Sequence, residues 1–309
     1  MELYLPIAET TIRVEIMMLL GLGIGFMSGL FGIGGGFLMT PLLILFGVPP
    51  PFAIGTQANH MVASSFAGLL SHIRRHSVDF KIGLVMSIGS LVGTMIGIVI
   101  FQMLQRTGQL NIVIIISYVL LLTTIGSSML LESSVSWTRR KKRKKRHQHY
   151  FVHNLPFKMR FAESGLYASA LLPLFIGGVG GILVTVLGIG GGFLLVPAMI
   201  YIIGMRPSVV PGTSLLQLTI ASAIATVVHA LATQSVDAVL AITLICGGVF
   251  GALLGASCTS VVSPVWARTS LALVVLSTAA WLIFDMIIPP EQLYTIIDIR
   301  VTPDARFTP

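Results

Sequence analysis

Two glycine-rich segments, Gly32–Leu38 and Gly188–Leu194, are the parts of this sequence best suited to bind a ligand. Both read Gly-Ile-Gly-Gly-Gly-Phe-Leu, and both lie within apolar sequence. A helix that begins at such a break directs free backbone N–H groups and a partial positive charge at the space before it, which suits an anion. The alternative is that the glycines only let two helices pack closely. The predicted backbone ligands are Gly34, Gly35, Gly36, Gly190, Gly191 and Gly192.

Polar side chains follow each glycine segment at a matching distance. Gly55-Thr56 in the first half corresponds to Gly212-Thr213 in the second. Polar side chains within apolar sequence usually face other protein groups or a water-filled path, so we expect them to complete the ligand site. The predicted side-chain ligands are Thr56, Gln57, Asn59, Thr213, Ser214 and Gln217. For the two threonines, a local helix cap is an equally good interpretation.

His60 is a candidate proton relay, because the pKa of histidine lies near neutral pH; the alternative is a histidine that is simply hydrogen-bonded. Other reactive groups are not indicated. Cys246 and Cys258 fall in one predicted helix, about 18 Å apart along its axis, which is too far for a disulfide. Neither glycine segment ends in the Lys-Ser/Thr pair of a phosphate-binding loop. We therefore predict no enzymatic activity, no metal and no cofactor.

The composition is that of a membrane protein. Hydrophobic residues make up 55% of the 309 positions and charged residues only 10%, too few charges for the surface of a soluble domain. Charged residues are absent between positions 16 and 73 and between positions 165 and 205. Long uncharged stretches are typical of transmembrane helices. The expected location is the inner membrane of a bacterium, with several crossings.

The two halves of the chain repeat the same order of segments. After each glycine segment come the Gly-Thr pair, a Ser-Val-Asp triplet and a helix with glycine at every fourth position, which predicts close helix packing. We predict an all-α integral membrane protein with two repeats, each a glycine-broken helical hairpin followed by three transmembrane helices. The predicted parts are residues 14–131 (first repeat), 132–164 (linker), 165–286 (second repeat) and 287–309 (polar tail).

The glycine break decides the predicted topology of each repeat. A single helix over residues 14–48 would be about 52 Å long, whereas the hydrocarbon core of a bilayer is about 30 Å thick. Two short helices that fold back on each other at the glycines fit this thickness. Each repeat then crosses the membrane an odd number of times, so the two repeats are expected to be inverted. Charge counting alone does not distinguish inverted from parallel repeats.

A basic tract joins the two repeats. Arg139–Arg146 consists entirely of lysine and arginine. Between membrane spans, such a tract predicts a cytoplasmic linker with anionic lipid as a further partner. Nucleic acid is the alternative partner for a run of this kind, but we do not predict it here. A homo-oligomer is compatible with the sequence and is not specified by it.

These motifs together resemble the TauE/SafE family of sulfite and organosulfonate-linked anion exporters. The resemblance rests on the duplicated glycine segment with its following proline, the Gly-Thr helix, the Ser-Val-Asp turn and the glycine row, and it covers nearly all of residues 15–285. It implies an inner-membrane transporter of small anions and does not fix the substrate. The basic linker is longer and more charged than is usual in the family, so no function is carried onto it.

We therefore expect a secondary transporter that exports a small anion, such as sulfite or an organosulfonate, by alternating access from a site between the glycine segments. Lysine and arginine are absent from the predicted interior, which favours weak and reversible binding. Because the cell interior is negative, an anion can leave without a coupling ion, gaining about 2.3 kcal/mol per charge at 100 mV. Two alternatives stay open: a cation-coupled permease for another small solute, such as a carboxylate or amino acid, and a non-transporting membrane scaffold.

Overall fold

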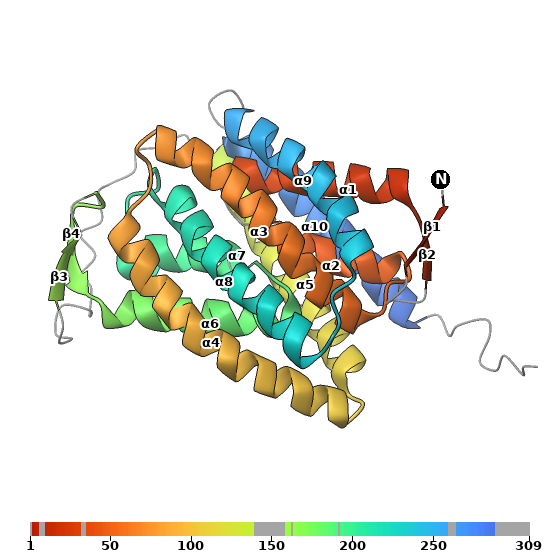
Figure 1. Ribbon diagram of the computed structural model, residues 1–309. Helices are drawn as coiled ribbons and strands as arrows, with labels where there is room; N and C mark the ends of the chain where they lie inside the picture. Colours follow the sequence, from red (N-terminus) through yellow and green to blue (C-terminus); the bar gives the residue numbers. More distant parts are fainter. Residues whose placement is uncertain are drawn as a thin grey trace, which may run out of the picture.

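The computed structural model describes residues 2–5, 10–31, 35–138, 158–161, 163–190, 192–258 and 264–287. Within these ranges the chain is almost entirely helical (Figure 1). The helices of the first half are Val14–Phe31 (α1), Gly36–Leu45 (α2), Pro50–Arg74 (α3), Phe80–Arg106 (α4) and Leu110–Thr138 (α5). Those of the second half are Leu171–Leu187 (α6), Gly192–Ala198 (α7) with the π-helical Met199–Ile203 (η2), Val210–Ala232 (α8), Ala238–Cys258 (α9) and Pro264–Ile287 (α10). Each half thus has two helices that meet at a glycine segment, followed by three further helices, as predicted.

Six of these helices are long and apolar enough to cross a membrane, namely α1, α4, α8 and α9 with parts of α5 and α10. α3 is equally long, but its polar side chains keep it out of this group. α2, α6 and the continuous α7–η2 helix are shorter. Large apolar side chains such as Leu19, Val99 and Met103 are 68%, 64% and 68% exposed, which suits contact with lipid. The predicted all-helical membrane architecture is confirmed.

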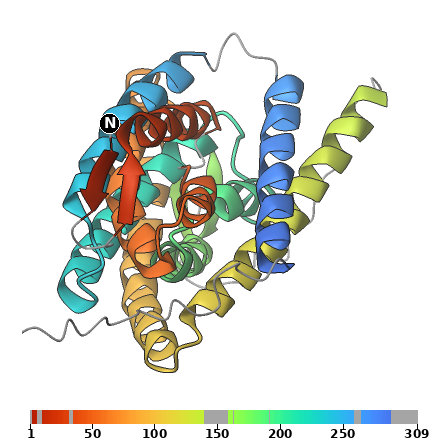
Figure 2. The ribbon, with the colours of Figure 1, turned by 90° about the vertical axis from the view of Figure 1, so that its right-hand side faces the viewer.

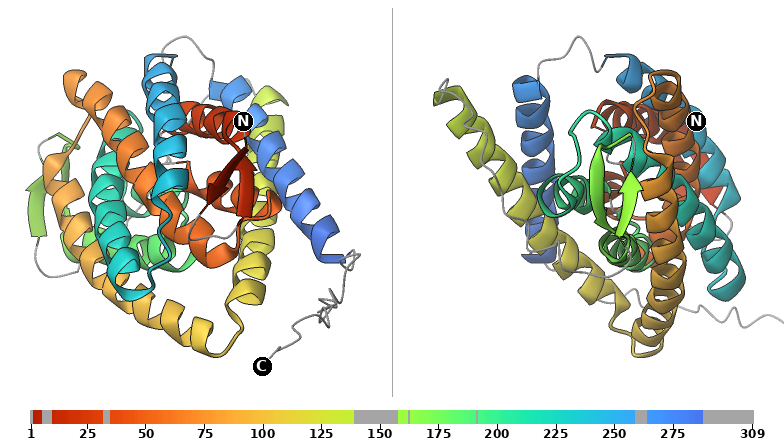
Figure 3. Two further views of the ribbon diagram at one scale, coloured as in Figure 1. Left: turned by 45° about the vertical axis from the view of Figure 1, so that its right-hand side comes forward. Right: turned by 90° about the vertical axis from the view of Figure 1, so that its left-hand side faces the viewer.

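Two short antiparallel β-hairpins were not predicted. They are formed by Glu2–Leu5 (β1) with Thr10–Arg13 (β2) and by Lys158–Phe161 (β3) with Leu166–Ser169 (β4). They lie at opposite ends of the molecule (Figure 1), and each comes to the front in one view of Figure 3. β4 lies at the start of the predicted second repeat, residues 165–286, before its first helix. Gly165, with φ +63, forms the turn that lets residues 166–169 pair with β3, so α6 begins only at Leu171.

The linker between the repeats also differs from the prediction at its start. α5 continues to Thr138, seven residues beyond the predicted end of the first repeat at Leu131. The cause is that residues 132–138 contain no proline or glycine that would end a helix. The basic tract Arg139–Arg146 and the tail from residue 288 lie outside the described residues, so the predictions for them stay predictions.

The glycine rows bring pairs of helices into backbone contact, as predicted. α1 packs along α9, and α4 packs along α6 (Figure 1). A methyl group on Gly93 would overlap the carbonyl oxygen of Gly178, and one on Gly251 would overlap that of Leu22. Glycine is required at these positions because the neighbouring atoms are backbone, which cannot move aside as a side chain can. Residue numbers rise together along both members of each pair, so the paired helices are parallel.

Two equivalent hydrogen bonds tie the halves together. The backbone N–H of Asp237 donates to Thr56 Oγ1, and the backbone N–H of Asp79 donates to Thr213 Oγ1, both at 2.9 Å. The start of α3 therefore lies against the residues that follow α8, and the start of α8 lies against those that follow α3. The two helices occupy equivalent positions in the repeats, and they run antiparallel to each other.

Thr213→Val is expected to destabilise the protein by about 1–3 kcal/mol, because the buried N–H of Asp79 would lose its acceptor. Thr56→Val should act similarly through its own link. Thr219→Val is the matched control, since the Thr219 hydroxyl donates to the carbonyl of Leu215 within α8 and does not join the halves. Melting temperatures of the detergent-solubilised proteins measure the effect. Equal melting temperatures for the Thr213 and Thr219 variants would contradict the structural role of the link.

α5 and α10 form a pair on one side of the bundle (Figure 2). Gly126 of α5 faces α10, because a methyl group there would lie 2.6 Å from a side-chain carbon of Leu276. α10 also contacts α2, and α5 sends fully buried side chains inward, among them Ile114, Tyr118 and Leu122. The pair therefore forms a wall beside the broken helices.

Candidate functional site

The two glycine segments meet in the interior. A methyl group on Gly36 would lie 2.7 Å from the carbonyl oxygen of Gly188 and 2.9 Å from the amide nitrogen of Gly190, and all three glycines are buried. Gly35 has φ +57 and lies beside Ile24 of α1, so the chain has turned back on itself between the two helices. The first broken hairpin is thus formed, and its tip contacts the second glycine segment.

The second half folds back in the same way. α6 ends at Gly188, which has φ +64, and Leu195 of the next helix returns to pack against Gly180 of α6. Gly192 is the first residue of α7. The two predicted ligands in the middle of the segments, Gly34 and Gly191, lie outside the described residues, so their roles stay predictions.

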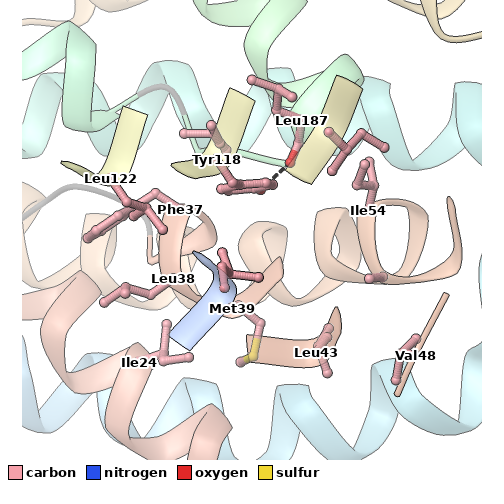
Figure 4. Close-up of a cluster of buried hydrophobic side chains, with 14 of the residues drawn as sticks. Ile24, Phe37, Leu38, Met39, Leu43, Val48, Ile54, Tyr118, Leu122 and Leu187 are labelled. Atoms are coloured by element: carbon pink, nitrogen blue, oxygen red, sulfur yellow. Dashed lines mark hydrogen bonds between the residues drawn. The ribbon is translucent and has the colours of Figure 1, made fainter. Parts of the chain in front are cut away.

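A backbone carbonyl at each break has a partner within the protein. The Tyr118 hydroxyl of α5 donates a hydrogen bond to the carbonyl oxygen of Leu187, the last residue of α6, within a cluster of buried apolar side chains (Figure 4). At the first break, the Gly35 carbonyl accepts from the N–H groups of Leu38 and Met39. A broken helix in a membrane needs such partners, so both breaks are built into the fold.

Two polar side chains of α3, the helix that contacts the first break, are buried and have no hydrogen-bond partner among the described residues. α3 reaches the break through Met61, whose sulfur a methyl group on Gly36 would overlap. Gln57 and His60 lie three residues apart on this helix and are both 0% exposed. Among the described residues, the Gln57 amide atoms and both ring nitrogens of His60 have no hydrogen-bond partner. Burying such groups is costly unless a ligand or water satisfies them.

Gln217 of α8 is equally buried, but it has a partner. Its Nε2 donates to Ser90 Oγ of α4 at 2.5 Å, and the Ser90 hydroxyl in turn points to the carbonyl oxygen of Gly177 in α6 at 3.0 Å. Gln217 Oε1 has no hydrogen-bond partner within the described part of the chain. This side chain therefore links α8 to the α4–α6 pair while one polar atom stays unpaired.

The remaining predicted side-chain ligands have other surroundings. Thr56 and Thr213 accept the hydrogen bonds that join the halves. Ser214 is buried and donates to the carbonyl of Pro211 at 2.9 Å. Asn59 is partly exposed, in contrast to its neighbours on α3. A ligand role for these four residues stays a prediction.

One correspondence between the halves was missed by sequence reasoning. When the two Gly-Thr pairs are aligned, His60 of the first half takes the place of Gln217 in the second. When the glycine rows are aligned, Gly248 of α9 takes the place of Ser90. His60 Nε2 lies against the Cα of Gly248, since any Cβ there would overlap it. His60 of α3 thus faces Gly248 of α9, whereas Gln217 of α8 faces Ser90 of α4, and the register of the repeats was the signal that could have revealed this difference.

The electrostatics of the interior are set by neutral groups. Among the residues whose burial is described, the buried charged side chains are Asp79 and Asp237, which accept from backbone N–H groups at the starts of α4 and α9. Lysine and arginine side chains in that part of the chain are not buried. Arg74, Arg75 and Lys81 lie exposed at the turn between α3 and α4, toward the β3–β4 end (Figure 1). An anion in the interior would therefore meet amide, imidazole and hydroxyl donors.

Comparison with known proteins then assigns the chain. A family model described as "Sulfite exporter TauE/SafE" matches residues 17–282. The chain belongs to the TauE/SafE family. With its six long apolar helices, this TauE/SafE protein is a multi-pass membrane transporter, and the resemblance noted from the duplicated motifs is confirmed. A multi-pass protein of this kind is consistent with the predicted inner membrane of a bacterium.

Several relatives of this TauE/SafE protein are named as transporters. "Probable membrane transporter protein YjnA" of Bacillus subtilis (strain 168) is 31% identical over 251 residues, which cover 80% of this chain and 91% of that protein. "Probable membrane transporter protein YunE" of the same organism is 27% identical over 256 residues, 78% and 87% of the two chains. A "Probable membrane transporter protein" of Xylella fastidiosa (strain 9a5c) is 29% identical over 240 residues, 75% and 79%. No solved structure matches the chain.

Proposed function

We propose that this protein is a secondary transporter that exports a small anion such as sulfite or an organosulfonate. One observation carries the proposal: the two glycine segments meet at Gly36, Gly188 and Gly190, against Met61 of α3, and the buried Gln57 one turn earlier on that helix has no hydrogen-bond partner among the described residues. Backbone amides at broken helices and neutral side-chain donors can bind an anion without a fixed positive charge. Such binding is weak enough to be reversed, which a transporter requires.

The proposed site combines the backbone amides around Gly35, Gly36 and Gly190 with polar side chains from α3 and α8. The predicted contributions of Gly34, Gly191 and Gly192 belong to the same proposal. An anion held there would sit between the two halves of the molecule, at the position where broken helices of secondary transporters commonly place their substrate.

Alternating access would follow from movement of one half against the other. The proposal treats the halves as inverted repeats, and the antiparallel arrangement of the equivalent helices α3 and α8 supports this. The reciprocal links through Thr56 and Thr213 support it as well, because they join the halves at both ends of the α3–α8 pair. Rocking about such a pair would expose the glycine segments first to one side of the membrane and then to the other.

Flux measurements in liposomes test the proposal. The purified protein is expected to move radiolabelled sulfite or an anionic organosulfonate such as methanesulfonate faster than empty liposomes do. At a membrane potential of 100 mV, a monoanion should distribute about 50-fold toward the positive side, since one charge gains about 2.3 kcal/mol. The Gly23→Ala protein is the control for glycine substitutions that are expected to reduce the flux, because a methyl group at Gly23 would have no neighbour within 4 Å.

Two outcomes of the flux measurement would count against the proposal. Flux no faster than that of empty liposomes would reject this substrate class. Accumulation that follows an imposed sodium or proton gradient rather than the potential would favour the cation-coupled permease, and the same liposomes with a labelled carboxylate or amino acid would identify its solute.

A further inference from the structure

We infer that the transported oxyanion binds on the first-half side of the glycine segments, where His60 and Gln57 donate to it, and that Gln217, the counterpart of His60, has a structural role. The inference rests on the proposed function and adds to it the half of the molecule and the side chains that hold the solute. It arises from a difference between two otherwise equivalent parts of the fold.

The same three-helix contact occurs twice in the fold, and each copy takes helices from both halves of the chain. A glycine of the helix before a break packs against the backbone of a glycine-row helix from the other half, and the opposite side of that backbone faces a polar residue of the helix that follows the broken hairpin. The His60 contact consists of Gly25 (α1), Gly248 (α9) and His60 (α3), and the Gln217 contact consists of Gly181 (α6), Ser90 (α4) and Gln217 (α8).

In the Gln217 contact the polar side chains are joined by hydrogen bonds. The Gln217 amide donates to Ser90, and the Ser90 hydroxyl points to a backbone carbonyl of α6. The other polar residues of α8 at this level are also bonded: Ser214 donates to a carbonyl at 2.9 Å and Ser222 to one at 2.7 Å. Most of the polar atoms around the Gln217 contact are therefore hydrogen-bonded within the protein and need no ligand.

In the His60 contact the corresponding hydrogen bonds are missing. Gly248 has no side chain to offer, and the His60 ring occupies the space that a serine there would need. Among the described residues, His60, Gln57 and the hydroxyls of Ser28 and Ser65 have no hydrogen-bond partner. Their counterparts in the second half are the bonded residues named above and, for Ser28, the apolar Val184.

The unpaired atoms of His60 and Gln57 matter more than those of the hydroxyls. Serine and threonine in a helix can turn to bond a carbonyl one turn earlier, so an unpaired hydroxyl is easily satisfied. This also applies to Thr94 and Thr226, which are unpaired elsewhere in the fold. The His60 imidazole and the Gln57 amide cannot do this, and they leave four buried polar atoms without a partner, whereas their counterparts Gln217 and Ser214 leave one, the Oε1 of Gln217.

The chemistry of this pair suits an oxyanion. The Gln57 amide has two N–H donors and a neutral imidazole has one, so together they can reach several oxygens of one sulfite or sulfonate group. Gln57 lies one helical turn before Met61, which contacts Gly36 of the first glycine segment, so backbone amides of that segment can complete the site.

The test is to replace His60 and Gly248 with the glutamine and serine found at the equivalent positions, Gln217 and Ser90. In the double variant His60→Gln with Gly248→Ser, the new serine can accept from the new glutamine as Ser90 does from Gln217. This protein is expected to fold with a melting temperature at least equal to that of the wild type, because a bonded pair replaces an unpaired histidine. Its sulfite flux in liposomes is expected to fall by about tenfold or more, since donors to the anion are lost.

Two further variants keep the test decisive. Gln57→Met removes an unpaired buried amide at nearly constant shape, so it should not reduce stability, yet it should lower the flux similarly. Ser90→Ala is the control at the Gln217 contact: it should lower the melting temperature, by leaving the Gln217 amide unpaired, and leave the flux per folded protein unchanged. Sulfite should raise the melting temperature of the wild type and of Ser90→Ala, but not that of the Gln57 and His60 variants.

The outcomes separate this inference from the proposed function. If wild-type liposomes move neither sulfite nor methanesulfonate, the proposed function fails and the inference fails with it. If the wild type transports and the Gln57→Met protein and the folded double variant transport equally fast, the inference alone is wrong. A loss of flux in Ser90→Ala as large as that in Gln57→Met would also overturn the inference, because the Gln217 and His60 contacts would then contribute equally to transport.

Discussion

Gly25→Ala is expected to lower the melting temperature by about 5–10 °C and to abolish transport, whereas Gly23→Ala should change neither. Both glycines lie in α1, two positions apart. A methyl group on Gly25 would overlap the carbonyl oxygen of Gly248 in α9, while one on Gly23 would have no neighbour within 4 Å. The first substitution must force two backbones apart, and the second fills open space.

The Gly25→Ala substitution should also disturb His60 in the candidate site. Gly248 lies between Gly25 on one side and His60 on the other, so displacing α9 moves it against the histidine ring. Thermal unfolding of the detergent-solubilised protein and sulfite flux in liposomes measure the two effects. A Gly25→Ala protein as stable and active as Gly23→Ala would mean that α1 and α9 are not in backbone contact.

Gly36→Ala is expected to reduce transport by about tenfold or more in protein that still folds. Gly36 is helical, with no positive φ, so alanine is compatible with its backbone conformation. The added methyl would nevertheless lie 2.7 Å from the carbonyl oxygen of Gly188 and 2.9 Å from the amide nitrogen of Gly190. The substitution therefore separates the two glycine segments at the point where we propose that the anion binds.

A double variant identifies the cause of the loss. The methyl on Gly36 would also overlap the Met61 sulfur, which is the end of a flexible side chain. Met61→Ala in the Gly36→Ala background removes that contact and leaves the backbone contacts in place, so flux should stay low. Recovery of flux would show that crowding of Met61, and not separation of the glycine segments, caused the defect.

The helices were predictable because their signals are local. An apolar stretch too long for one crossing and interrupted by glycines predicts a broken hairpin, and α1 with α2 and α6 with α7 follow that pattern. The sequence also predicted that α4 and α9 each pack closely against another helix, because glycine at every fourth position lies on one helix face. The β4 strand was missed because four residues beside a left-handed Gly165 carry too little periodicity to be told from the start of a helix.

The site was predictable only in part. Gln57 and Gln217 stood out as amides within apolar sequence, but their different surroundings could not be read from residue type. Thr56 and Thr213 were ambiguous between ligand and cap, and the structure gives them a third role, as acceptors from backbone groups of the opposite half. Such partners lie 181 and 134 positions away along the chain, beyond the reach of any local pattern.

Composition, the repeated motifs and the length of the interrupted apolar stretches were enough to specify a duplicated, helical membrane protein with two broken hairpins. These properties depend on hydrophobicity and backbone flexibility, which each short segment carries in itself. The packing of the halves decided which buried polar atoms have partners: Gln217 is bonded to Ser90, and His60, its equivalent, faces a glycine. A hydrogen bond needs both groups at the right distance, and folding brings distant segments together to meet that condition.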